Sequence, residues 1–161
     1  MSYEFNGLPP HILLVHAVIV MVPLAALCAV ATLLWPAARR RLGAATPVLG
    51  LAAVVLVFFT QQAGDWLLAR VGHMSAILAH AAAGRTLLPW AWGLLGASLA
   101  AWLWHRLSIW ARLAARWGTG WAAGVACVFM AAVLAVCVGI TANVVVIGEA
   151  GTRAVWGAVL V

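Results

Sequence analysis

Charged side chains are scarce in this sequence. Only 7% of its 161 residues are Asp, Glu, Lys or Arg; three of these are acids, and all nine basic ones are arginines. A typical soluble domain carries about 25% charged residues, so the composition excludes that class. The hydrophobic content of 67% and the mean hydropathy of +1.12 indicate an integral membrane protein.

Cysteine occurs three times and never in closely spaced pairs. Cys28, Cys127 and Cys137 each stand alone in an apolar segment, so neither a zinc knuckle nor covalent attachment of a c-type haem is supported. The His-Glu-x-x-His pattern of zinc proteases is also missing. We expect the three thiols to be small, buried hydrophobic groups.

Four apolar segments are long enough to cross a membrane core, which takes about 20 helical residues. We place the spans at residues 12–35, 42–68, 76–105 and 121–147 of a single domain covering residues 1–161. Continuous apolar runs are unlike the alternating segments of a transmembrane β-barrel. Short connections predict an all-α, antiparallel up-down four-helix transmembrane bundle.

Arginine positions predict the orientation of this bundle. Two connections, between spans one and two and between spans three and four, hold six of the nine arginines: Arg39, Arg40, Arg41, Arg106, Arg112 and Arg116. The positive-inside rule places both connections in the cytoplasm and both termini outside, in a bacterial inner membrane. We expect these arginines to contact anionic lipid, and residues 106–117 to form an interfacial helix. No nucleic-acid partner is expected, because the arginines form no long basic face.

Ionisable side chains gather at the opposite, outer ends of the spans. At 1.5 Å per residue, His11, Asp65 and His80 all lie about 35 Å from the inner ends of their spans. His16 lies about 7.5 Å deeper, and Glu149 lies slightly further out. Because ionisable groups are costly inside a membrane, a group of them at one depth predicts a functional site.

Helical geometry limits which of these residues can meet. Gln61 and Asp65 are four residues apart and share a helix face. His11 and His16 diverge by about 140° on an ideal helix, so both reach one site only if His11 lies on a non-helical segment after two prolines. The alternative for His11, Asp65 and Glu149 is that headgroup water simply hydrates them at the interface.

Several short strings resemble a known family. They are His-Ile-Leu-Leu-Val-His at 11–16, Gly-Asp-Trp at 64–66, His-Ala at 80–81, and Ile-Gly at 147–148 followed by Ala-Val-Trp at 154–156. In this order they resemble the bacterial four-helix membrane family catalogued as domain of unknown function 2231, most closely its actinobacterial members. The resemblance covers nearly the whole chain.

The resemblance implies a fold and candidate residues without a reaction. Family members typically have His-Pro-x-x-x-His in the first span, where this chain has Ile12, and often a histidine where this chain has Glu149. A carboxylate thus replaces a fourth histidine. Some members are fused to Rieske-type iron–sulfur domains, which implies membrane electron transfer by analogy.

The first functional hypothesis is a membrane cytochrome. Its b-type haem would lie near the outer face, between His80 and either His11 or His16, because facing helices of a bundle suit ligation by two imidazoles. Arg85 would pair with a haem propionate. The activity, if any, would be membrane electron transfer with a redox partner.

Two other hypotheses remain open. One is a Zn, Cu or Fe ion held by the same three histidines and completed by Asp65 or Glu149. The other is a non-catalytic accessory subunit of a larger membrane complex, since a chain with almost no soluble loop has little surface with which to act alone. Homo-oligomers are compatible with each.

Overall fold

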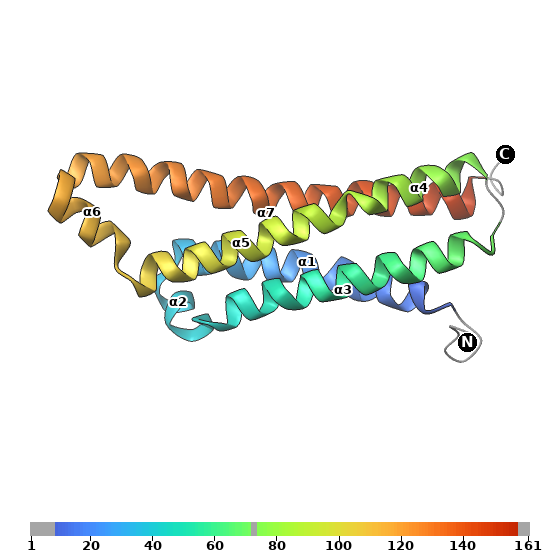
Figure 1. Cartoon of the computed structure of the whole chain (residues 1–161), viewed down its shortest axis with the longest axis horizontal. Coiled ribbons are helices and arrows are strands. Elements are labelled where there is room, and N and C mark those ends of the chain that lie inside the picture. The colour runs from blue at the N-terminus through green and yellow to red at the C-terminus, as the bar shows by residue number, and fades with distance from the viewer. Residues whose placement is uncertain (1–8, 72–73, 158–161) are drawn as a thin grey trace.

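The computed structural model describes residues 9–71 and 74–157, and the regular secondary structure of this part of the chain is entirely helical (Figure 1). Four helical segments in it are long and apolar enough to cross a membrane. The prediction of an all-helical protein with four candidate spans is therefore confirmed. The helices are α1 (Pro10–Leu34), α2 (Pro36–Leu42), α3 (Ala45–Leu68), α4 (Ser75–Arg85), α5 (Leu87–Arg106), α6 (Ile109–Trp117) and α7 (Thr119–Trp156).

Prolines set several of the helix boundaries. Pro10 occupies the first turn of α1, where a missing N–H costs nothing. Trp35 is extended because it precedes Pro36, and its conformation separates α1 from α2. The third span is interrupted at Thr86, between α4 and α5, because Pro89 cannot donate to the Arg85 carbonyl four residues earlier.

The connection between α5 and α7 contains the helix expected at the interface. Ser108 adopts a left-handed conformation with φ of 51°, which ends α5 and starts α6 in a new direction. Gly118, with φ of 90°, makes the next turn. The fourth span is longer than predicted, because α7 continues nine residues past residue 147 and has 38 residues in all.

The four spans form a closed ring of neighbours. Helix α1 packs on α3, α3 on α5, α5 on α7, and α7 on α1, while α4 packs mainly on α7. Figure 1 shows α1 beginning and α7 ending at one end of the bundle, and α2 and α6 at the other. We call these the histidine end and the arginine end, after the residues that gather there.

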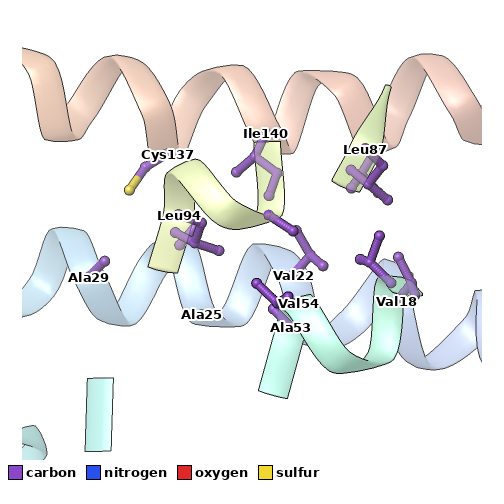
Figure 2. Packing of buried hydrophobic residues seen from close by; sticks show 14 of the residues in the cluster. Val18, Val22, Ala25, Ala29, Ala53, Val54, Leu87, Leu94, Cys137 and Ile140 are labelled. Atoms are coloured by element: carbon purple, nitrogen blue, oxygen red, sulfur yellow. The ribbon is translucent and has the colours of Figure 1, made fainter. Parts of the chain in front are cut away.

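Small and branched apolar side chains fill the centre of the bundle. Figure 2 shows Val22 of α1, Ala53 of α3, Leu94 of α5 and Ile140 of α7 meeting in one cluster. Leu94 and Ile140 are fully buried. Close-packed helices of this kind form a rigid frame that fixes the side chains at both ends.

The outer surface of the bundle is apolar. Val128 and Val138 of α7 are 71% and 67% exposed, as expected for side chains that face lipid. Of the three cysteines, Cys137 is buried in the core, as predicted, and Cys28 is half-buried. The prediction that all three are buried is wrong for Cys127, which is exposed on α7.

Candidate functional site

A cavity of about 640 Å³ lies at the histidine end, between α1, α3, α4 and α7. Its volume is within the range of small-molecule and cofactor sites, about 300–1,000 Å³. Most of its wall is apolar, and its polar groups are few. The ionisable residues that line it are His11, His16, Asp65, His80 and Arg85.

His11 lies in the first turn of α1 and reaches across to α3. Its Nδ1 atom is 3.0 Å from the carbonyl oxygen of Thr60. A carbonyl can only accept, so Nδ1 carries the proton and donates it, and Nε2 keeps its lone pair. Backbone hydrogen bonding of this kind is the usual way in which a metal-binding histidine is fixed in one tautomer.

His80 repeats this arrangement on the other side of the cavity. It projects from α4, and its Nδ1 atom is 3.2 Å from the carbonyl oxygen of Ile147 on α7. The same argument gives an Nδ1–H tautomer and an Nε2 atom able to act as a ligand. Both imidazoles are half-buried.

The imidazoles of His11 and His80 are neighbours in an edge-type contact, and we call them the histidine pair. The ring centres of His11 and His80 are 6.3 Å apart, with an angle of 72° between the ring planes. Two imidazoles bound to one ion by bonds of about 2 Å have ring centres about 6 Å apart when the bonds are collinear and about 5 Å apart at a tetrahedral angle. The observed distance between the ring centres is close to the spacing of two imidazoles that bind one ion.

A glycine lies against each ring of the histidine pair. A Cβ atom on Gly64 would lie 3.0 Å from Cε1 of His11, and one on Gly151 would lie 3.1 Å from Cε1 of His80. Each glycine is four residues after the carbonyl that binds the ring, so it lies one helical turn further along the same face. Both imidazoles can approach the neighbouring backbone because no side chain intervenes.

Asp65 and Arg85 form an ion pair beside the cavity. Arg85 Nη2 is 3.4 Å from Asp65 Oδ1, and the two side chains are 68% and 57% exposed. One turn earlier on α3, Gln61 Nε2 donates to the Gly84 carbonyl over 2.8 Å. Gln61 and Asp65 thus use their shared face to bind the end of α4, which positions His80.

The remaining predicted ligands lie apart from the histidine pair. Glu149 is paired with Arg153 over 3.5 Å on α7 and does not line the cavity. His16 lies on an exposed side of α1, and its Nδ1 atom is 2.6 Å from the carbonyl of Ile12. His11 is helical, so the condition for bringing it together with His16 is not met. Across the described residues, no three His, Cys, Asp or Glu side chains form a metal-binding group.

Hydrogen bonds also fix the break between α4 and α5. The Thr86 hydroxyl donates to the Ala83 carbonyl over 2.7 Å and accepts from Asn143 Nδ2 over 3.0 Å. The second bond joins the break to α7. Asn143 therefore holds the end of α4 against α7, the helix whose Ile147 carbonyl orients His80.

Sequence reasoning missed the two glycines and the two carbonyls. Gly64 lies within one of the strings that carry the family resemblance, and Gly151 lies between two of them, but their spacing from Thr60 and Ile147 had no meaning until the neighbouring helices were known. The available signal was a glycine on one span at the same depth as a predicted histidine ligand on the adjacent span. Such a glycine indicates that the histidine ring can pack against the neighbouring backbone.

Comparisons with known proteins add nothing to this geometry. No family model, no curated protein and no solved structure matches the chain.

Proposed function

We propose that this protein binds one b-type haem between His11 and His80 and transfers electrons in a membrane. The observation that carries the proposal is the histidine pair. Its two imidazoles come from different helices, their ring centres are 6.3 Å apart, and the Nδ1 atom of each is held by a backbone carbonyl. When bound, the haem supplies reversible one-electron chemistry at its iron.

Haem suits this site better than a bare metal ion. A haem iron would need only two protein ligands, because the porphyrin supplies the other four. A Zn, Cu or Fe site commonly needs three or four protein ligands, and the described residues bring together only two. The apolar wall of the cavity also suits a porphyrin face.

Each residue around the cavity has a defined role in the proposal. His11 and His80 would hold the haem iron, and their bonds to Thr60 and Ile147 keep Nε2 available and raise its basicity. Arg85 pairs with a propionate, since an arginine binds a carboxylate through two parallel hydrogen bonds. Its present partner, Asp65, holds it at the rim of the cavity.

The arginine distribution supports an orientation for the proposed cytochrome. With the arginine end in the cytoplasm, the histidine end faces the outside of a bacterial inner membrane. The haem then lies near the outer face, where a periplasmic or membrane-bound redox partner can approach. The resemblance to the family with Rieske fusions agrees with such a partner, by analogy alone.

The first test is a reduced-minus-oxidised visible spectrum of the detergent-purified protein, with metal analysis of the same sample. We expect a sharp reduced α-band and one iron per chain. A colourless protein with stoichiometric zinc or copper contradicts the proposal and supports the metal-ion hypothesis. A protein with no metal contradicts both and supports an accessory subunit.

Substitution of Gly151 is expected to lower haem occupancy. A valine there would press on Cε1 and Nδ1 of the His80 ring and so disturb the hydrogen bond between Nδ1 and the Ile147 carbonyl. Changes next to a metal ligand commonly weaken metal binding about tenfold or more. Titration of apo-protein with haem measures the effect.

The matched control is Gly124→Val, also on α7, because Gly124 is exposed, does not line the cavity, and an added Cβ there meets nothing within 4 Å. Equal haem affinity in the Gly124 and Gly151 variants would show that the contact with His80 is unimportant.

A further inference from the structure

A second cavity, of about 250 Å³, lies at the arginine end of the bundle. Residues from α1, α2, α3 and α5 surround it, and so does the glycine that follows α2. The lining residues are Thr32, Arg39, Gly43, Thr46, Ala101, Trp102, His105 and Arg106. This cavity is at the opposite end from the histidine pair, so the proposed haem site does not account for it.

Arg39 is fixed at the cavity by the end of α1. Its Nε atom donates to the Thr32 carbonyl over 3.1 Å, and its Nη2 atom donates to the Leu33 carbonyl over 3.0 Å. These carbonyls belong to the last turn of α1, which lacks intrahelical donors. A guanidinium has five N–H donors, so three remain for a ligand. Partial burial lowers the pKa of Arg39 from its ordinary value, but an arginine stays charged in proteins.

Two further polar groups in the cavity lack hydrogen-bond partners. Thr46 is 1% exposed, and its hydroxyl has no partner among the described residues. The buried Nε2 atom of His105 has none either. Leaving a buried polar group without a hydrogen bond is unfavourable, so such groups call for an explanation. A ligand in the cavity would satisfy both.

The charged residues around the cavity indicate that the ligand is an anion. Arg39 and Arg106 line it, and the two acids of the described residues, Asp65 and Glu149, are both paired with arginines at the histidine end. Thr46 also lies in the first turn of α3, whose backbone N–H groups favour anions. The cavity therefore offers donors and positive charge with no carboxylate.

We propose that the arginine-end cavity binds a phosphate group through Arg39, Thr46, His105 and Arg106. Phosphate has several acceptor oxygens, and arginine is the side chain best suited to bind them. The phosphate belongs either to the headgroup of an anionic lipid or to free inorganic phosphate. The first source fits the position of the cavity, at the end of the spans, where headgroups lie. This site is more specific than a general attraction between surface arginines and lipid.

The test compares two probes on the full-length protein in a neutral detergent. One probe is phosphatidylglycerol, followed by native mass spectrometry with phosphatidylcholine as reference, and the other is inorganic phosphate, followed by calorimetry. Thr46→Val removes the buried hydroxyl at nearly constant shape, and Arg106→Gln removes a charge at the rim. We expect each to weaken binding about tenfold, as for loss of one hydrogen bond to a charged group. Arg39→Gln is a poorer test, because it also removes the contacts that end α1.

Arg40→Gln is the matched control, because Arg40 is exposed, follows Arg39 directly and does not line the cavity. It should bind each probe like the unchanged protein. Lipid binding that depends on Thr46 supports a headgroup site, and phosphate binding with the same dependence supports a free-phosphate site. Binding of neither probe, or equal losses in the Thr46 and Arg40 variants, overturns the proposal. Haem content, measured in parallel, reports on the other end of the bundle independently.

Discussion

His80→Ala is expected to abolish the Soret band of the purified protein. The imidazole of His80 is one of the two proposed haem ligands, and no third His, Cys, Asp or Glu side chain of the described residues forms a metal-binding group with the pair. His11→Ala should have the same effect, because the histidine pair acts as a unit across the cavity. The visible spectrum and the pyridine haemochrome assay of each variant measure the loss.

Two substitutions in the same cavity serve as controls. His16→Ala should keep the band, because His16 lies on an exposed side of α1 and its Nδ1 atom is turned to its own helix. Asp65→Ala should also keep it, since Asp65 is not one of the two proposed ligands and its carboxylate pairs with Arg85. If His16→Ala removed the band and His11→Ala preserved it, the assignment of the first-span ligand would be wrong.

Gly50→Val is expected to destabilise the bundle. A Cβ atom at position 50 would lie 3.1 Å from the Cα atom of Leu95, so α3 and α5 are in near backbone contact there. The obstacle is backbone, which cannot rotate away, and valine adds two further methyl groups. Overpacking of a core costs about 1–3 kcal/mol. Thermal unfolding in detergent, followed by circular dichroism, should show a lower midpoint.

The control for Gly50 is Gly96→Val on α5, which makes the same chemical change at an exposed position. An added Cβ at Gly96 meets nothing within 4 Å, so the change should leave the midpoint nearly unaltered. A similar fall in both variants would point to helix propensity and not to the contact between α3 and α5.

The sequence was sufficient to predict the spans and the common level of His11 and His80. Each follows from a one-dimensional quantity, the length of an apolar run or the number of residues from its end. Helix ends were less accurate. The run of apolar residues in α7 stops near residue 147, whereas its backbone hydrogen bonds continue to Trp156 through polar residues.

Contacts between helices could not be predicted in the same way. Asp65 was predicted as a metal ligand, whereas in the structure its carboxylate pairs with Arg85, because α3 and α4 lie together. The roles of Gly64 and Gly151 depend on which ring lies above each of them. Thr46 shows the same limit, since a threonine near the end of an apolar segment gives no sign that its hydroxyl will be buried without a partner.

The two carbonyls that orient the histidine pair lie on helices that are synthesised at different times. The partner of His11 lies on α3, so that half of the site is complete once the second span has entered the membrane. The partner of His80 lies on α7, the last span to be synthesised. Since chains fold from the N-terminus as they emerge, capture of the proposed haem between two oriented rings would follow insertion of the fourth span. A chain halted before α7 would present His11 with its carbonyl partner and His80 without one.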